Sequence, residues 1–342
     1  MKHSKVLFIS ILGIGAIVTG YGLHNHIVNV RAARLDHIAA PAAYFPPGAI
    51  WTQDISHAPL DPQSSTIIAW LADAGGWGFG KMNVDFSLRV LQADASTPRV
   101  PFREAPGFGT ADSDKISTIP LPAGGGIEGL PDYTCPPPEG DCHLIVVDRN
   151  QGKLYEVYQA NYADGALSGL GNAVWNLNRV YPPSGRGDQC SSTDAAGLPI
   201  APLLFNADEL ALGRISHAIR FILPNPRIRA HVFVHPATHA GAPLGPVTAP
   251  PMGAHFRLKA SYDMSRLTPA AQVVARAMQK YGMFLSDGGN MALTAQSDRD
   301  TTAKYTDMDF GAHDLQDLKV TDFEVLDMGT PIRLTDDCVR NR

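Results

Sequence analysis

Apolar residues recur with helical spacing in two segments of the chain. In residues 65–72 the apolar side chains form one stripe, and a serine at the start can cap the first turn. In residues 269–281 they again share one face, behind Thr268 as N-cap and Pro269 at the first helical position. Gly282 follows and ends the pattern. The sequence therefore predicts a short helix and a longer one.

Most of the remaining pattern predicts strands. Residues 83–90 alternate strictly between apolar and polar, as expected for a half-buried strand. Two extended runs, 143–148 and 154–159, flank a turn-forming segment and predict a hairpin. Turn-forming Pro and Gly residues separate further expected strands at 173–177, 215–223, 230–235, 255–260 and 323–326.

These elements indicate a mainly β fold with a few helices. No fixed-period repeat appears, and no shift in composition marks a second domain after residue 50. We therefore expect residues 48–342 to form a single large domain resembling a twisted β-sandwich.

The N-terminal segment has the pattern of an uncleaved membrane anchor. Two lysines in residues 1–5 precede an uncharged apolar run at 6–23, long enough to nearly span a bilayer core. Bulky and polar residues follow it, in place of a small-residue cleavage site. Residues 1–5 are expected to stay cytoplasmic, 24–47 to form a stalk, and the bulk of the chain to lie outside. If the segment is cut, the protein is secreted.

Composition excludes one class of partner. The chain has 342 residues, 44% of them hydrophobic and 18% charged, as in an ordinary globular protein. Its net charge is -5, and its lysines and arginines are scattered along the chain. Nucleic-acid binding, which needs a concentrated basic surface, is not expected.

Four cysteines in an exported protein predict disulfides. Cys135 and Cys142 flank three prolines and would close a short loop, which favours their pairing. Cys190 and Cys338 would then form a long-range bridge, although spacing alone excludes no connectivity.

The segment from Cys190 to Arg220 resembles a family of exported, mostly bacterial β-rich proteins. Members share a Thr/Ser-Asp-Ala-Ala-Gly-Leu-Pro-Ile segment, then an Asp-Glu pair and a His-Ala-x-Arg-Phe strand. The similarity covers about two thirds of this chain, at 143–149, 154–156, 193–200, 208–209, 217–221, 251–253, 257–259 and 281–283. Some members are joined to carbohydrate-binding modules, so the resemblance favours a polysaccharide partner. For a bacterial protein, the N-terminal anchor predicts a single pass through the inner membrane, with the bulk of the chain in the periplasm.

Asp194, Glu209 and Glu156 are candidates for a catalytic carboxylate pair. Glycoside cleavage needs one carboxylic acid to protonate the leaving oxygen and a second carboxylate as nucleophile or base. The alternative is structural: Asp194 caps a turn, and Glu209 begins an exposed helix.

Basic and aromatic residues keep a lyase of acidic sugars open. His217 lies in the apolar row of the predicted strand 215–223, where it is either a core histidine or an acid or base beside a carboxylate. Arg220 can bind a uronate carboxylate or pair with an acid, and Arg257 and Tyr281 could support the same reaction.

Three weaker site predictions complete the set. His231, His235 and His239 could bind zinc with an open fourth position, although their spacing matches no established motif and surface or packing roles are the default. Trp77 could stack on a sugar ring. Asp287 precedes a Gly-Gly-Asn turn of the kind that often lines a site.

The sequence thus supports three hypotheses. The first is an envelope-anchored glycoside hydrolase or polysaccharide lyase that uses Asp194 and Glu209 with His217 and Arg220, and no cofactor. The second is a non-catalytic envelope protein that binds a glycan or another protein. The third is a zinc-dependent hydrolase. The first predicts two of the named carboxylates in one concave pocket, with perturbed pKa values.

Overall fold

The computed structural model describes residues 38–341, apart from 40, 42, 106–111 and 137–139. The predicted anchor at 6–23 and most of the predicted stalk lie outside these residues. In the described part, no helix has both the length and the apolar character needed to cross a membrane.

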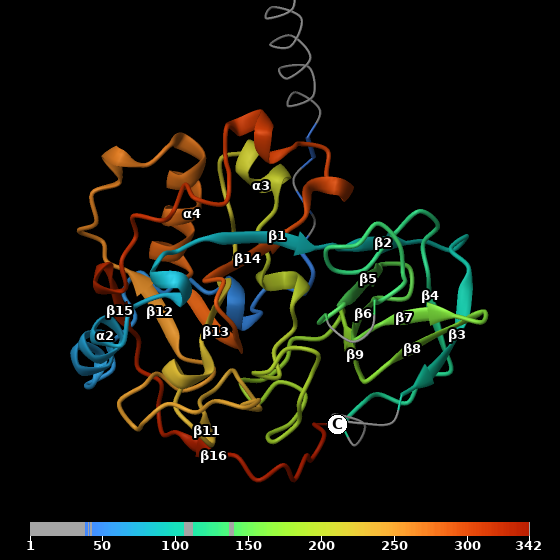
Figure 1. Ribbon diagram of the computed structural model, residues 1–342, viewed down its shortest axis with the longest axis horizontal. Helices are drawn as coiled ribbons and strands as arrows, with labels where there is room; N and C mark the ends of the chain where they lie inside the picture. Colours follow the sequence, from blue (N-terminus) through green and yellow to red (C-terminus); the bar gives the residue numbers. More distant parts are fainter. Residues whose placement is uncertain (1–37, 40, 42, 106–111, 137–139, 342) are drawn as a thin grey trace, which may run out of the picture.

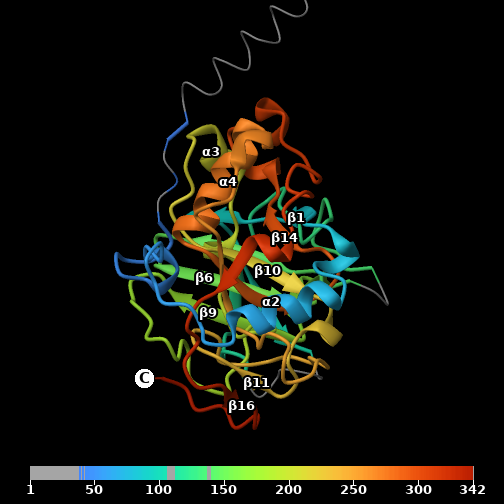
Figure 2. The same cartoon turned by 90° about the vertical axis from the view of Figure 1, so that its left-hand side faces the viewer.

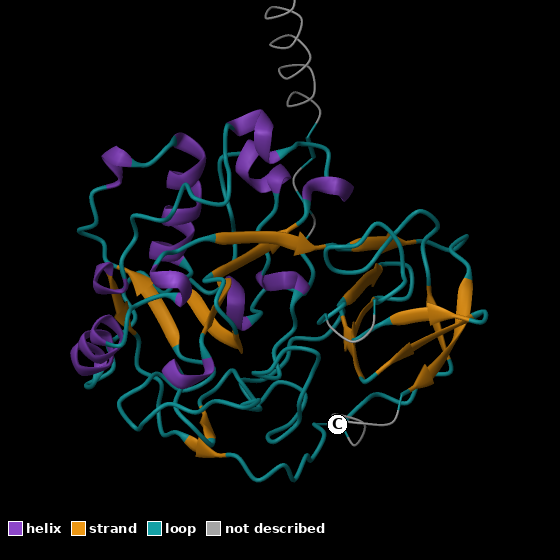
Figure 3. Ribbon diagram, in the orientation of Figure 1, coloured by secondary structure: helices purple, strands orange, loops and turns teal. Residues whose placement is uncertain are grey.

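The described chain is mainly β, which confirms the expected fold class, and Figure 3 shows its strands in orange and helices in purple. The largest sheet has the strand order β1-β14-β10-β13-β12-β15. Two of its neighbouring pairs, β1 with β14 and β10 with β13, are parallel, and the others are antiparallel. Its strands are β1 (Val84–Leu88), β10 (Ile219–Leu223), β12 (His255–Leu258), β13 (Met283–Gly288), β14 (Leu293–Gln296) and β15 (Phe323–Val325).

Two four-stranded sheets form the other half of the molecule, on the right of Figure 1. Their orders are β2-β5-β6-β9 and β4-β3-β8-β7. A fourth, two-stranded sheet pairs β11 (Val232–Phe233) with β16 (Ile332–Arg333). The strands of the two four-stranded sheets are β2 (Leu91–Ala93), β3 (Arg99–Glu104), β4 (Thr118–Pro120), β5 (Leu144–Asp148), β6 (Lys153–Tyr158), β7 (Asn161–Ala163), β8 (Ala166–Gly169) and β9 (Gly171–Asn176).

Three α-helices lie in the described part: α2 (Ser64–Asp73), α3 (Ala207–Ala211) and α4 (Pro269–Lys280). Figure 2 shows α2 and α4 beside the largest sheet, where α2 packs against β15 and α4 against β12. Short 3₁₀ helices occupy Ile50–Thr52, Gly78–Gly80, Ala201–Leu203, Asn225–Arg227, Met264–Arg266, Asp298–Asp300, Tyr305–Met308 and Val320–Asp322.

Strand β5 lies between two hydrophobic cores, and all five of its residues are buried. Ile145 and Val147 belong to the larger core, beneath the six-stranded sheet and its helices. Leu144 and Val146 belong to a smaller core that includes residues from both four-stranded sheets. Successive side chains of a strand point to opposite faces, so one continuous apolar run serves both cores.

The elements predicted from local pattern are largely present. Both helices form, with Thr268 capping α4 through a hydrogen bond from the Ala271 N–H. The predicted hairpin is the antiparallel pair β5 and β6. The predicted strand at 215–223 is shorter, because the N–H of Ala218 donates to the Trp51 carbonyl instead of to a neighbouring strand.

Both expected disulfides are confirmed, Cys135–Cys142 and Cys190–Cys338. They indicate an oxidising, extracellular compartment.

Candidate active site

A cavity of about 270 Å³ lies at the carboxyl ends of the parallel strands β10 and β13. Ligand sites commonly form at this edge, because loops leave neighbouring parallel strands there together. Its wall includes Asp141, His143, Tyr158, Ser192, Thr193, Asp194, Asn225, His239, Met252 and Asp287.

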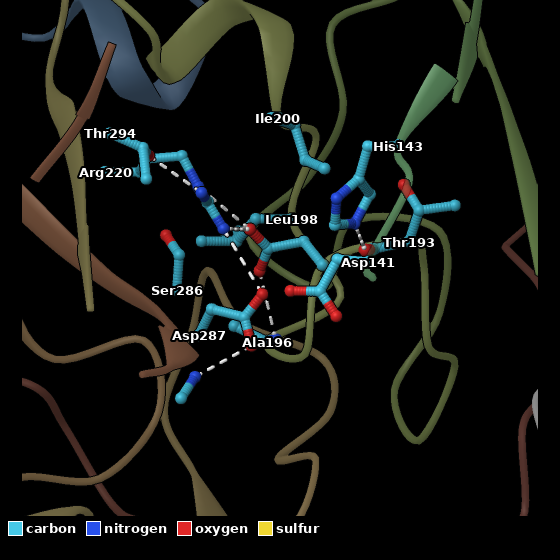
Figure 4. Close-up of polar contacts among 12 residues, drawn as sticks. Asp141, His143, Thr193, Ala196, Leu198, Ile200, Arg220, Ser286, Asp287 and Thr294 are labelled. Carbon is cyan, nitrogen blue, oxygen red and sulfur yellow. Dashed lines mark hydrogen bonds and ion pairs between the residues drawn. The ribbon is translucent and has the colours of Figure 1, made fainter. Parts of the chain in front are cut away.

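A buried arginine joins two carboxylates beside this cavity. Arg220 Nε and Nη2 donate to Asp194 Oδ2 at 3.2 and 2.8 Å, and Nη2 lies 3.4 Å from Asp287 Oδ2. Nη1 donates to the Thr294 hydroxyl at 2.8 Å. The Asp194 side chain is fully buried, whereas that of Asp287 is 27% exposed. Figure 4 shows Arg220 and Asp287 converging, with Asp141 nearby.

The segment that carries Asp194 is held from several sides. Asp194 Oδ1 accepts from the Ala196 N–H, which also donates to the Ser286 carbonyl of β13. Gly197 has φ +75°, and a Cβ there would lie 2.2 Å from the Thr238 hydroxyl, so the turn requires glycine. Cys190, joined to Cys338, anchors its start. The Thr-Asp-Ala-Ala-Gly sequence thus forms a turn that is hydrogen-bonded to β13 and places Asp194 beside Arg220 of β10.

The two carboxylates share a site that favours one bound proton. Burial raises the pKa of Asp194 to about 7; the Arg220 charge opposes this rise, and the Asp287 charge adds to it. Burial also raises the pKa of Asp287, against the charge of Arg220. Two nearby carboxylates resist double ionisation. The Gly288 N–H donates to Asp287 Oδ1 at 2.7 Å, which opposes the rise in the pKa of Asp287, so the two carboxyl groups titrate as a pair that shares one proton.

A second ion pair, in which the imidazole is buried and the carboxylate partly exposed, supports another part of the cavity wall. His143 Nδ1 lies 2.7 Å from Glu128 Oε2, and its Nε2 lies 2.9 Å from the Thr193 carbonyl. Burial alone would lower the pKa of His143, but its hydrogen bond to Glu128 and the charge of Glu128 raise it to about 9. Because both ring nitrogens face oxygen acceptors, the ring is an imidazolium that donates twice. It ties the Thr193 backbone to β5.

Asp141 brings another carboxylate to the cavity. It is exposed, immediately precedes Cys142, and lies 3.4 Å from the Tyr158 hydroxyl. Its carbonyl and that of Cys142 accept N–H bonds from Gln159 and Ala160, which fixes this end of the hairpin. The negative charge of Asp141 contributes to the raised pKa of Asp287, consistent with their proximity.

Of the four predicted catalytic residues, the structure brings Asp194 and Arg220 together and places Glu209 and His217 elsewhere. The latter two line a different pocket. Glu209 accepts from the Asn206 N–H in a capping box of α3, and its Oε1 lies 3.2 Å from His217 Nε2. Burial would lower the pKa of His217, but the Glu209 carboxylate raises it. The expected pairing of Asp194 with Glu209 is therefore corrected to Asp194 with Asp287.

Glu156 and Trp77 are both interior residues, which corrects their predicted roles at a substrate. Glu156 is fully buried and accepts hydrogen bonds from the backbone of Ile200 and Ala201 and from the Trp175 indole. Trp77 is 1% exposed and donates its indole N–H to the Leu318 carbonyl. Neither side chain can contact a sugar.

Arg257 and Tyr281 also lie outside the cavity wall. Arg257 pairs with Glu324 at 2.7 Å and donates to the carbonyls of Ile55 and Ala58. Tyr281 is the C-cap of α4. Their contacts are structural, and the prediction that they bind substrate is corrected.

The three histidines do not converge on a metal. His235 bonds to Asp188 at 2.8 Å, His231 has a positive φ of 60°, and His239 accepts the Gly241 N–H at the cavity wall. No group of three metal-ligating side chains is found within the described residues. The zinc prediction is therefore corrected: His235 and His239 make local hydrogen bonds instead.

Several residues of the cavity wall were missed by the pattern analysis, among them Asp141, Tyr158, Asn225 and His143, together with Glu128, the partner of His143. A signal was present for two of them. Asp141 immediately precedes Cys142, which the sequence predicts to be disulfide-bonded, and His143 immediately precedes the four apolar residues that begin β5. Nothing local indicated Asn225.

Comparisons of the chain with protein-family models, with curated proteins and with solved structures gave no match in any of the three searches.

Proposed function

We propose that this protein is a glycoside hydrolase in which Asp287 is the general acid and Asp141 the second carboxylate. One observation carries the proposal: a partly exposed carboxyl group whose pKa is raised by burial and an exposed carboxylate line one cavity. Glycoside cleavage needs this combination.

Asp287 suits the role of the acid. A general acid must hold its proton near neutral pH and reach the leaving oxygen. Burial raises the pKa of Asp287, and its partial exposure gives it access to the cavity. Asp194 and Arg220 act as positioning residues, because Arg220 contacts both carboxyl groups and so fixes Asp287 at the cavity wall.

The reaction balances with these groups. Asp287 gives its proton to the glycosidic oxygen as the bond from the sugar carbon to that oxygen breaks. Asp141 takes a proton from the attacking water, or attacks the sugar carbon itself before water releases it. Proton exchange with solvent then restores Asp287 as the acid and Asp141 as the carboxylate.

Hydrolysis is favoured over lyase chemistry. A lyase of acidic sugars needs a cation to bind the uronate carboxylate, and Arg220 was the candidate. Its N–H groups already donate to Asp194 and Thr294, and it pairs with Asp287. Because Arg220 already binds these protein groups, the structure supports a hydrolase better than a lyase.

The setting of this activity is part of the proposal. An oxidising compartment, together with the apolar run at 6–23, supports a hydrolase anchored in a bacterial inner membrane with its catalytic part in the periplasm. Its partner would be an envelope or environmental polysaccharide.

The test is release of reducing ends from a panel of polysaccharides by the full chain and by Asp287→Asn. We expect kcat to fall by about 10²–10⁴-fold in the variant, the usual contribution of a general acid. Activity of the parent should also fall as pH rises through the raised pKa of Asp287, because the acid then loses its proton. Asp164→Asn is the matched control, since Asp164 is an exposed turn residue with φ +51°, a conformation that Asn tolerates.

Two results would contradict the proposal. Equal rates of cleavage by the parent and by Asp287→Asn would show that Asp287 is not the general acid. Binding of a glycan without cleavage across the panel would favour the non-catalytic glycan-binding alternative.

A further inference from the structure

The Asp141 carboxylate depends on its backbone for its place at the cavity wall. Its side chain is exposed, so packing does not hold it. Within the described residues the carboxylate has one hydrogen bond, from the Tyr158 hydroxyl at 3.4 Å, which is long for a bond of this kind. The main chain at residues 140–142 therefore decides where this carboxylate lies.

The residues on both sides of Asp141 have backbone conformations that side chains rarely adopt. Cys142 has a φ of +46°, and Gly140 has a φ of +145°. A positive φ is unfavourable for a residue with a Cβ, and it persists only where the surrounding structure imposes it. Relaxation of the chain at Cys142 would turn Asp141 away from its present direction.

The Cys135–Cys142 bridge imposes this backbone. The Cys142 side chain is 4% exposed and belongs to the smaller core, which fixes its sulfur. A Cβ at Gly140 would lie 2.9 Å from that sulfur, so the chain just before Asp141 packs against the bridge. The N–H of Cys135 donates to Asn161 Oδ1 at 2.9 Å. The bridge therefore joins the turn around Asp141 to β7.

We propose that the Cys135–Cys142 bridge is a redox-sensitive device that holds Asp141 at the cavity, and that reduction of the bridge releases Asp141 and stops cleavage. The inference rests on the proposed function, in which Asp141 is the second carboxylate. The reductant is a dithiol, which gives two electrons and two protons to the sulfur–sulfur bond. Two cysteine thiols form, and the dithiol becomes a disulfide. Cys135 is partly exposed, which gives a small dithiol access to the bridge.

The first test removes the bridge and measures polysaccharide cleavage by the full chain in a non-ionic detergent. In Cys135→Ser with Cys142→Ser, we expect kcat per folded molecule to fall by about 10–10²-fold, the effect of misplacing a catalytic group by about 1 Å. KM should stay within about threefold, because binding contacts elsewhere in the cavity remain. An unchanged kcat overturns the inference.

A double-mutant cycle shows whether the bridge acts through Asp141. Asp141→Asn removes the carboxylate that the bridge holds, so loss of the bridge in that background should lower kcat by less than about twofold more. An equal loss of kcat in both backgrounds overturns the inference, because it would show that the bridge has only a general structural role.

Gly140→Ala disturbs the same turn and leaves both cysteines in place. The added Cβ would meet the Cys142 sulfur, and alanine disfavours a φ of +145°, so kcat should again fall by about tenfold or more. Gly165→Ala is the matched control, because Gly165 is exposed with a φ of +73° and lies outside the cavity wall. An equal fall of kcat in Gly140→Ala and Gly165→Ala overturns the inference.

Dithiothreitol tests the redox step. It should lower kcat of the parent to that of the bridge variant, change the bridge variant by less than about twofold, and lose its effect on the parent after reoxidation. An equal loss in the parent and in the bridge variant would assign the effect to Cys190–Cys338 and overturn the inference.

Hydrogen–deuterium exchange tests the position of Asp141 without any cleavage assay. The N–H groups of Gln159 and Ala160 donate to the carbonyls of Asp141 and Cys142. Loss of the bridge should speed their exchange by about tenfold or more and leave that of Leu177, at the other end of the hairpin, unchanged. Unchanged exchange at Gln159 and Ala160 overturns the inference. Faster exchange there, in a chain that cleaves no polysaccharide, sustains the release of Asp141 while the hydrolase proposal fails.

Discussion

Replacing Glu128 by Gln removes the charge that holds His143 as an imidazolium, while nearly preserving the shape of the side chain. The two side chains are 20% and 7% exposed, so solvent screens their interaction only weakly. Burial alone would make His143 neutral; its hydrogen bond to Glu128 and the charge of Glu128 instead raise its pKa from 6.5 to about 9. At about 1.4 kcal/mol per tenfold change in proton affinity, this rise corresponds to about 3 kcal/mol of stability.

The direction with pH follows from the sign of each change. Since the pKa of His143 is raised in the folded state, its stabilisation is complete below about 6.5 and is lost as pH rises through about 9. Burial would raise the pKa of Glu128, but its hydrogen bond to His143 and the charge of His143 lower it from 4.5 to about 2. The stabilisation that comes from the ionised Glu128 carboxylate is therefore lost only as pH falls below 4.5. The pKa changes of His143 and Glu128 describe one interaction, so its free energy is counted only once.

The assay is urea unfolding followed by tryptophan fluorescence at about pH 6, 7.5 and 9.5. The free energy of unfolding of Glu128→Gln should lie about 3 kcal/mol below that of the parent at about pH 6, about 2 kcal/mol at about pH 7.5, and close to it at about pH 9.5. Asp54→Asn is the control, because Asp54 pairs with Lys280 in solvent at 3.8 Å and should show no such trend. A deficit that is constant across pH, or absent at about pH 6, would refute the imidazolium assignment.

Two further predictions concern the frame of the cavity. Arg220→Met leaves Asp194 and Asp287 buried without their cation and should lower the free energy of unfolding by about 3–5 kcal/mol near pH 8. The loss should be smaller near pH 5, where Asp194, whose pKa is raised to about 7, binds a proton; equal losses at the two pH values would contradict this raised pKa. Cys190→Ser with Cys338→Ser opens a closed loop of 148 residues and should cost about 2–5 kcal/mol by urea unfolding, whereas an unchanged midpoint would show that the bridge does not constrain the unfolded chain.

Local signals in the sequence determined much of the secondary structure. Thr268 and Pro269 set the start of α4, and the apolar stripe of 65–72 matches α2, because caps and helical periodicity act within a few residues. The hairpin β5–β6 followed in the same way from short-range pattern, whereas the two cysteine pairings, which spacing favoured without excluding others, were confirmed by the structure. Asp194 and Arg220 were recognised as candidates from their residue types alone.

The composition of the cavity was decided by tertiary structure. Arg220 meets Asp287, 67 residues away, because β10 and β13 pair in parallel, and strand pairing over that distance has no signature within either strand. The same long-range packing buried Trp77, whose indole N–H donates to the Leu318 carbonyl. It also left Glu209 in the capping box of α3, without a second carboxylate as its partner. Residue type and periodicity show which side chains can do chemistry and which face they prefer. Which of them share a low-dielectric cavity, and so exchange protons, depends on contacts between distant segments that only the folded chain creates.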